Sequence, residues 1–380
     1  MAKQASKGME RFEYGETQEV LRTSAKKFLG ANFGTERVRE LCSAGTGFDE
    51  KDWNEMSALG WHGLLIPENM GGVGLGIYEL GILLEEQGYH LMVAPYLSSQ
   101  IGVLAIDAAA KAPQKKKLFP QIAEGAIRPT LAAFEKDQGW DLCAGGVKAK
   151  KSGKSYVLTG TKVNVMDAGS ADLLLVTTNT SKGPTLFAVD AKAKGVKITS
   201  NKLVDETRHT ATVKLTGVKV SEDAVLGAEG GAAKALEKAL PRIWVALAAE
   251  MLGAARKLLH TSVEYAKVRE QFGRPIGSFQ GVKHRLVDRF ADIENARSIV
   301  YGALWAQDHD APRALLTARM AKAYLSEVGP LTADTAVRTH GGIGFTWECD
   351  VHLFWKRLRW AQLAYGDGPF HRKALAEMIL

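Results

Sequence analysis

The spacing of hydrophobic residues divides the chain into three stretches. From about residue 15 to 125, apolar residues recur at helical spacing, as in Glu16–Leu29, Glu50–Leu59 and Ile77–Tyr89. Between about 127 and 227, short β-rich runs alternate with turn sequences such as SGKS and SKGP, a pattern typical of strands. The strands that we expect are Pro129–Phe134, Tyr156–Thr159, Leu173–Thr178, Thr185–Ala188, Val196–Thr199 and Ala211–Val218.

Helical spacing returns after Gly230, in much longer segments. The four helices that we expect are Ala232–Arg269, Gly281–Asp308, Ala311–Thr339 and Asp350–Leu363, with Pro241 as a place where the first could break. Long helices with few breakers favour an antiparallel bundle. The sequence therefore predicts an α+β fold with an N-terminal helical domain at 1–126, a central β-barrel-like domain at 127–228 and a C-terminal four-helix bundle at 229–380.

Composition places the chain among globular proteins. Its 380 residues exceed one ordinary core, and 46% are hydrophobic and 24% charged, which excludes a disordered or fibrous protein. The net charge of +7 would attract anions such as CoA, FAD or nucleic acid, although a solvated lysine surface is the simpler explanation. No aromatic residue interleaves with the densest lysine run, Lys115–Lys117, so we expect no nucleic-acid partner.

Cysteine usage and the N-terminal sequence bear on the compartment. Cys42, Cys143 and Cys349 are far apart and form no CxxC pair, so we expect neither a disulfide framework nor a metal site. The opening MAKQASKGMERFEYGETQ has no apolar core of the secretory type, and no run of about 18 apolar residues occurs anywhere. We expect a soluble, cytoplasmic protein without a membrane span.

Four segments carry more specific sequence patterns. They are YAKVREQFGRPIGSFQGVKHRLVD (Tyr265–Asp288), THGGIGFTWECDVHLFWKR (Thr339–Arg357), AYGDGPFHRKALAEM (Ala364–Met378) and the β-rich stretch Gly146–Val176. Together with the order helices, strands, helices, these segments resemble the acyl-CoA dehydrogenase family over nearly the whole chain. The first two motifs are the specific ones, since a chance match to both is remote.

The resemblance implies a flavoenzyme that desaturates an acyl-CoA thioester between its α and β carbons. In that family hydrogen bonds to the thioester carbonyl stabilise a developing enolate, and a carboxylate removes the α-proton. The β-hydrogen leaves as hydride to FAD, and an electron-transfer flavoprotein accepts the electrons. The resemblance therefore implies FAD as cofactor, an acyl-CoA as substrate and an electron-transfer flavoprotein as partner.

The first two motifs carry the FAD contacts of the family, often to the cofactor of a neighbouring subunit. Carried over by position, the FAD-binding residues are Arg269, Phe272 and Gln280 from the first motif and Arg338, Gly341 and Gly342 at the second. A guanidinium suits a diphosphate through charge-assisted hydrogen bonds, and glycine lets backbone N–H groups approach closely. His340 is either a flavin contact or a packed core histidine.

The catalytic carboxylate is where this chain departs from the family. The family tail Tyr-Glu-Gly-Thr, whose glutamate is the base, reads Tyr365-Gly366-Asp367-Gly368 here, and a second known base position aligns with Ile243. Asp367 and Glu250 are the nearby carboxylates and thus our candidate bases. Glu250 lies on an apolar helix, which could raise its pKa as a base requires, or it could pair with an arginine of the bundle.

The β region departs as well. Where family members carry Thr-Glu-Pro-Gly-Ala-Gly-Ser-Asp, this chain has the eight residues from Phe134 to Asp141, including Trp140. The family segment Trp-Ile-Thr is here Asn164-Val165-Met166, and a thioether cannot donate the hydrogen bond that a threonine gives. The hydroxyls that would bond the isoalloxazine ring are therefore missing.

Three functional hypotheses follow. We favour a subunit that pairs with a homologous catalytic chain, because GDGPFHR resembles the tail of the non-catalytic subunit in bacterial α2β2 acyl-CoA dehydrogenases, some of which act on steroid side chains. The alternative is a self-sufficient homotetrameric dehydrogenase that uses Asp367 or Glu250. The third is an acyl-CoA or nitroalkane oxidase-like flavoenzyme, which oxygen consumption would distinguish.

Overall fold

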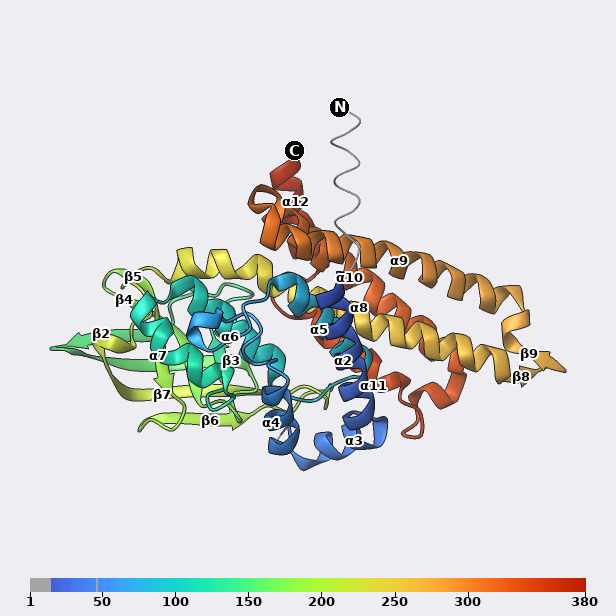
Figure 1. Cartoon of the computed structure of the whole chain (residues 1–380), viewed down its shortest axis with the longest axis horizontal. Coiled ribbons are helices and arrows are strands. Elements are labelled where there is room, and N and C mark those ends of the chain that lie inside the picture. The colour runs from blue at the N-terminus through green and yellow to red at the C-terminus, as the bar shows by residue number, and fades with distance from the viewer. Residues whose placement is uncertain (1–14, 46) are drawn as a thin grey trace. The chain divides into compact units, whose positions relative to one another are not determined.

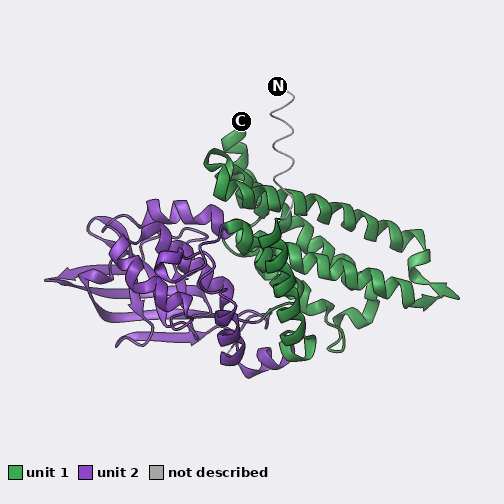
Figure 2. Ribbon diagram, viewed as in Figure 1, with its two compact units in different colours: residues 1–38, 77–92, 244–380 green, residues 39–76, 93–243 purple. Residues whose placement is uncertain are grey.

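The computed structural model describes residues 15–45 and 47–380 (Figure 1). The chain forms two compact units, each assembled from separate segments of sequence (Figure 2). Of the described residues, unit 1 combines 15–38 with 77–92 and 244–380, and unit 2 combines those between 39 and 76 with 93–243. The N-terminal segment, in which we expect no secretory signal, lies outside the described residues. Because the units interleave in sequence, the domain boundaries at 126 and 228 remain predictions.

Unit 1 is helical. Its main helices are α2 (Glu16–Asn32), α5 (Ile77–Tyr89), most of α8 (Ala232–Val268), α9 (Gln280–His309), α10 (Ala311–His340), α11 (Val351–Leu363) and α12 (Gly368–Ile379). The helix α3 (Thr35–Ala44) begins in unit 1. Short elements join the long helices: the strands β8 (Glu270–Gln271) and β9 (Arg274–Pro275), and the 3₁₀ turns η4 (Ile276–Ser278) and η5 (Gly341–Phe345). Helix α10 contacts α9, α11 and α12.

The long helices follow the apolar periodicity of the sequence. On α9, Ile293, Ala296, Val300 and Leu304 are buried at spacings of three and four residues, which places them on one face. Helix α8 continues through Pro241, where the sequence raised the prospect of a break. Burial of flanking apolar residues stabilises helical backbone on both sides, which offsets the one hydrogen bond that proline cannot donate.

Unit 2 combines helices with a sheet. Its helices are α4 (Glu50–Ala58), η2 (Glu68–Met70), α6 (Tyr96–Ala109), α7 (Ala112–Ala123) and η3 (Glu222–Ala224). Its strands are β1 (Pro129–Ala132), β2 (Lys148–Ser152), β3 (Ser155–Met166), β4 (Leu173–Thr180), β5 (Gly183–Asp190), β6 (Val196–Ser200) and β7 (Thr210–Ser221). The strand order is β1-β4-β2-β3-β7-β6, and β5 pairs with β4.

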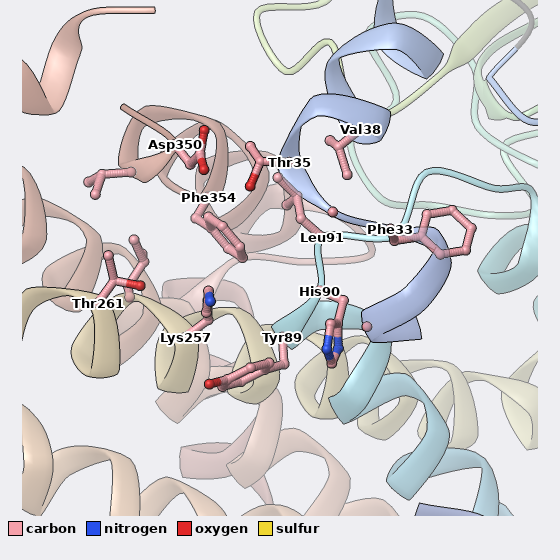
Figure 3. A pocket seen from close by; sticks show the side chains of 14 residues that line it. Phe33, Thr35, Val38, Tyr89, His90, Leu91, Lys257, Thr261, Asp350 and Phe354 are labelled. Atoms are coloured by element: carbon pink, nitrogen blue, oxygen red, sulfur yellow. The ribbon is translucent and has the colours of Figure 1, made fainter. Parts of the chain in front are cut away.

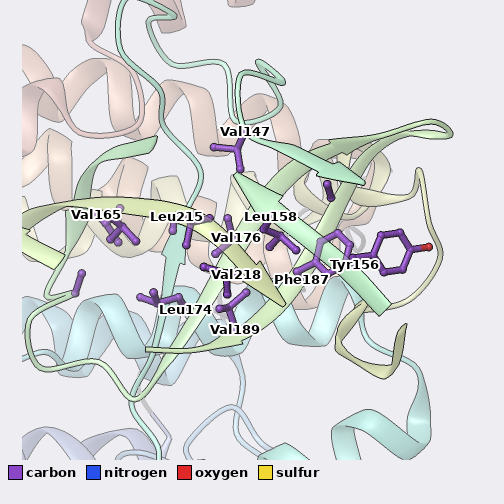
Figure 4. Close-up of a cluster of buried hydrophobic side chains, with 14 of the residues drawn as sticks. Val147, Tyr156, Leu158, Val165, Leu174, Val176, Phe187, Val189, Leu215 and Val218 are labelled. Atoms are coloured by element: carbon purple, nitrogen blue, oxygen red, sulfur yellow. The ribbon is translucent and has the colours of Figure 1, made fainter. Parts of the chain in front are cut away.

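The core of the sheet is built from alternate residues of its strands. Tyr156 and Leu158 on β3, Val176 on β4 and Phe187 on β5 are all almost fully buried in one cluster (Figure 4). Tyr156 packs edge-on against Phe187, with ring centroids 5.1 Å apart. Strand β3 shifts register against β7 near Gly160 and again before Val165. Such bulges bend a strand, so they curl the sheet around its core.

The predicted α+β class is confirmed, with helices before and after a central β region. Strand β2 was not expected from the sequence, because it reads KAKKS and buries only Ala149. With a single inward apolar residue the strand shows no alternating pattern, and its pairing with β3 is what orders it. Helix α12 was missed for a similar reason, since it is short and buries few residues.

Two searches for particular features gave negative results. Within residues 15–45 and 47–380, no helix has the length and apolar character needed to cross a bilayer. The same residues contain no group of three or more His, Cys, Asp or Glu side chains placed to hold a metal ion. All three cysteines are free thiols.

Candidate functional site

The two glycine- and arginine-containing motifs lie next to each other in unit 1. Tyr265, near the end of α8, stacks on His340, the last residue of α10, with ring centroids 4.3 Å apart. His340 is buried, its Nδ1 lies 2.8 Å from the Ala336 carbonyl, and burial lowers its pKa. Of the two interpretations of His340, the packed histidine is thus present, and it joins the ends of the two motifs.

Four of the candidate cofactor residues lie close to this stack in sequence. Arg269 follows Tyr265 by one helical turn, and Arg338 precedes His340; both are exposed. Neither guanidinium has an ion pair among the described residues. Gly341 has φ of +69°, and a Cβ at Gly341 or Gly342 would have no neighbour within 4 Å. Each motif therefore presents an exposed guanidinium without an ion pair, and the second adds open backbone at Gly341 and Gly342.

The remaining two candidates lie on the turn that leads into α9. Phe272 is 92% exposed in the turn between β8 and β9, and its ring lies 6.1 Å from that of Phe279. Gln280 is the first residue of α9 and is exposed. An exposed aromatic ring, two unpaired guanidiniums and side-chain-free backbone suit an anionic dinucleotide such as FAD, so these residues fit the adenosine diphosphate half of the cofactor.

The loop before α12 contains the position at which the family motif has its catalytic glutamate. Gly366 occupies it with φ of +110°. A Cβ there would lie 2.5 Å from Cδ1 of Phe370 and 2.8 Å from Nε2 of His371, which real side chains do not tolerate. Only glycine adopts this backbone conformation without strain. The loop thus lacks a carboxylate at residue 366 and has no room for one.

A buried lysine holds this loop. The Lys322 ammonium donates to the Gly366 carbonyl at 2.8 Å, to the Gln362 carbonyl at 3.0 Å and to Ser326 Oγ at 3.1 Å. Burial lowers the pKa of Lys322 to about 7, and the Asp367 carboxylate opposes part of that shift. The sequence analysis missed Lys322. Its signal was a lysine inside the apolar stripe of a predicted helix, beside Ala321 and Leu325.

The two candidate bases, Asp367 and Glu250, form hydrogen bonds with different partners. Asp367 is the N-cap of α12, and its Oδ1 accepts the Phe370 N–H at 2.8 Å. Glu250 is buried and accepts a hydrogen bond from Arg357 Nη1 at 2.8 Å, while Nη2 of the same arginine donates to the Met92 carbonyl at 3.3 Å. The ion pair with a bundle arginine, which the sequence left open for Glu250, is therefore present.

The β region has a buried ion pair of its own. Lys162 Nζ lies 2.7 Å from Glu135 Oε1, and Glu135 also accepts the N–H groups of Gly146 and Val147. Burial lowers the pKa of Lys162, and the paired carboxylate opposes that shift. This pair connects β3 with the segment after β1.

The other departures from the family pattern also lie in unit 2. Phe134 directly precedes Glu135 and Trp140 follows it by five residues; both are half-buried, and Met166 at the end of β3 is buried. The Met166 side chain offers only a thioether, which donates no hydrogen bond. Ile243, at the second known base position, is fully buried and apolar. Unit 2 thus retains a charged scaffold without the hydroxyl donors expected of the family.

Comparison with known proteins places these features in a family. The model described as "Acyl-CoA dehydrogenase, N-terminal domain" matches residues 15–126, and "Acyl-CoA dehydrogenase, C-terminal domain" matches residues 230–380. The acyl-CoA dehydrogenase IpdE2 of Mycobacterium tuberculosis is 31% identical over 343 residues, covering 90% of this chain and 91% of the relative.

Two solved structures are similar over almost the whole chain. One is a variant of the Tcur3481–Tcur3483 steroid ACAD, with a TM-score of 0.87 and 32% identity over 96% of this chain and 98% of that one. The other is the ChsE4–ChsE5 complex from M. tuberculosis, with a TM-score of 0.88 and 27% identity over 97% of this chain and 98% of that one.

Proposed function

Because the chain belongs to the acyl-CoA dehydrogenase family, we propose that it serves the α,β-desaturation of an acyl-CoA thioester as one subunit of a heteromeric complex. In this proposal a homologous partner subunit supplies the catalytic base. The chain described here supplies contacts to FAD through the motifs at 265–288 and 339–357. The similarity to a steroid ACAD supports a bulky thioester as substrate, and the similarity to the ChsE4–ChsE5 complex supports a heteromeric assembly.

The reaction needs one carboxylate placed close to the α-carbon of the thioester. FAD, when bound, accepts the hydride that leaves the β-carbon. The protein must remove the α-proton with a correctly placed base and hold the thioester carbonyl. A displacement of about 1 Å in such a base can cost about a hundredfold in rate. Placement of the carboxylate therefore decides whether a given cleft can work.

The observation that carries the heteromeric role is the conformation of Gly366. Its φ of +110° and the closeness of Phe370 and His371 leave no space for a glutamate side chain. Lys322 holds the same backbone through the Gly366 carbonyl. Asp367, one residue later, uses its carboxylate to cap α12. A loop arranged in this way offers no base at the family position, which is what a non-catalytic subunit would show.

The cofactor contacts support a role across a subunit interface. The charged side chains Arg269 and Arg338 are exposed and unpaired within the described part of the chain, so they are available to a diphosphate. Phe272 is exposed in the same region and can pack against an adenine ring. The hydroxyl donors for an isoalloxazine ring, by contrast, are replaced by Phe134, Trp140 and Met166.

The test compares the purified chain with the chain produced together with its homologous partner. Alone, the chain should retain little FAD and show no bleaching of flavin absorbance with acyl-CoA. Co-purification with a subunit that has an intact Tyr-Glu-Gly-Thr tail should give a flavinated, active complex. Full FAD occupancy together with bleaching by the isolated chain would refute the heteromeric role and favour the homotetramer.

A second test addresses Asp367 directly. In the heteromeric proposal Asp367→Asn leaves the activity of the complex unchanged, because asparagine also caps a helix. If Asp367 were the base of a self-sufficient enzyme, the same substitution would abolish bleaching while FAD stays bound. Glu250→Gln serves as the matched variant for the other candidate, with the circular dichroism of both variants as a check on folding.

A further inference from the structure

Unit 1 contains a cavity of about 360 Å³ that the proposed function does not use (Figure 3). It lies between the end of α2, the start of α3, the end of α5, the middle of α8 and the start of α11. Its apolar walls include Phe33, Leu91 and Phe354. Its volume falls within the range of about 300–1,000 Å³ that is usual for small-molecule sites.

A lysine provides the cationic group of this cavity. Lys257 is half-buried, and its Nζ lies 5.2 Å from the centre of the Tyr89 ring. Within the described residues Lys257 forms no ion pair, whereas Arg256 beside it pairs with Glu85. A partly desolvated ammonium group without a carboxylate partner is stabilised when an anion binds to it. The cavity therefore favours an anionic ligand.

A histidine provides a second polar group on the same wall. Nδ1 of His90 lies 3.0 Å from the Glu86 carbonyl, so this nitrogen carries the hydrogen and Nε2 is the acceptor in the neutral ring. Burial lowers the pKa of His90, and Lys257 and Lys26 add to the shift, which the Glu86 carbonyl and carboxylate oppose. Nε2 points toward Gly30, where a Cβ would lie 3.8 Å from it.

Asp350 is the one carboxylate among the described residues that line the cavity. It precedes α11, and in the view of Figure 3 the Phe354 ring lies between Asp350 and Lys257. A bound anion would therefore lie on the Lys257 side. An apolar body attached to the anion would extend along Phe354 and Leu91.

The cavity lies away from the individual FAD-contact residues and from the base position, although Asp350 and Phe354, which line it, belong to the second motif. Trp244 on α8 donates to the Tyr365 carbonyl beside the base position, and Arg269 follows the other end of the same helix. At 1.5 Å per residue, Lys257 lies about 20 Å along the helix axis from either point. A ligand in the cavity would thus not overlap the proposed FAD contacts or the loop at 365–368.

We propose that this cavity is a binding site for a small organic acid. The carboxylate of the ligand pairs with Lys257, and its hydrocarbon part packs against Phe33, Leu91 and Phe354. The inference does not rest on the proposed dehydrogenase function, because it uses only the cavity and the groups that line it. Its test can therefore succeed or fail independently of the heteromeric role.

The test uses two probes of the same shape and the full chain. Isothermal titration should show binding of 4-bromophenylacetate and at least about tenfold weaker binding of the neutral 4-bromophenylacetamide, since a charge-assisted contact distinguishes them. Lys257→Met should weaken binding of the acid by a similar factor. Lys267→Met, an exposed lysine on the same helix that pairs with Glu264, is the matched control and should change nothing.

Crystallography of the chain with 4-bromophenylacetate tests where the acid binds. The anomalous signal of bromine should lie among Leu91, Lys257 and Phe354. Thr261→Leu, which adds bulk to the cavity wall, should abolish binding while the thermal unfolding midpoint stays within a few degrees. Equal binding of acid and amide, unchanged binding in Lys257→Met, or bromine elsewhere in the molecule would each overturn the proposal.

Discussion

At the scale of single residues, Gly366 and its neighbours decide how the chain can act. A positive φ, two close aromatic side chains and the bond from Lys322 to the Gly366 carbonyl together define one loop conformation. The absence of a glutamate was readable from the sequence. That the loop also has no space for one depends on Phe370 and His371, whose positions no local pattern predicts.

We predict that Gly366→Glu will not restore a base. The new side chain would require the loop to move, at a cost of about 1–3 kcal/mol for the strained backbone. Urea unfolding should therefore show reduced stability, and a complex of this variant with a partner subunit that lacks its own base should not show bleaching of flavin with acyl-CoA. Gly366→Ala is the control, because it brings the same strain without a carboxylate. Bleaching in the glutamate variant alone would mean that the loop rearranges readily.

A second residue-scale prediction concerns pH. His62 is fully buried, stacks on Trp53 with centroids 3.8 Å apart, and burial lowers its pKa to about 4. Between pH 6.5 and 4 the unfolded state binds a proton that the native state does not, so stability falls as pH falls through this window. The loss should approach about 3 kcal/mol near pH 4.

His62→Gln should remove that part of the pH dependence, as measured by urea unfolding at pH 7 and pH 4.5. The exposed His309→Gln variant is the control, and its unfolding free energy should follow that of the unchanged protein at both pH values. If the His62 variant loses as much unfolding free energy between pH 7 and pH 4.5 as the unchanged protein, the pH dependence arises from other groups.

At the scale of elements, the β8–β9 turn and the 3₁₀ turn η5 lie within the two sequence motifs of unit 1 that are most specific to the family. The Tyr265–His340 stack holds the ends of α8 and α10 together, so two motifs about 70 residues apart in sequence meet at these helix ends. The sequence predicted the side chains through the family resemblance. Their closeness follows from antiparallel packing of long helices, which the periodicity indicated only in outline.

We predict that Arg269→Gln and Arg338→Gln each weaken FAD binding by the assembled complex by about tenfold or more, the loss expected for a charge-assisted contact. Bound flavin per complex after gel filtration is the measure, and it does not depend on turnover. Arg274→Gln is the matched control, since Arg274 lies in the same turn and stacks on Phe279 at 4.2 Å. Equal flavin loss in all three variants would indicate a general effect of the turn.

At the scale of the whole molecule, each compact unit is assembled from segments distant in sequence. In unit 1 a buried cluster joins four helices: Arg22 on α2 pairs with Glu85 and Glu86 on α5, and Tyr301 on α9 and Arg256 on α8 also contact Glu85. Buried charges require such partners. This cluster explains why α2 and α5 belong with the C-terminal helices rather than with the rest of the N-terminal region.

The sequence alone determined the helical and β stretches, because the period of apolar residues is a local property of each element. Through its motifs it also indicated the family and the candidate residues from Arg269 to Gly342. Only the tertiary structure decided what Glu250 and Asp367 contact, why no side chain fits at Gly366, and that four separate segments line the cavity at Lys257. These depend on packing between residues far apart in the chain, and spacing along one element contains no information about such partners.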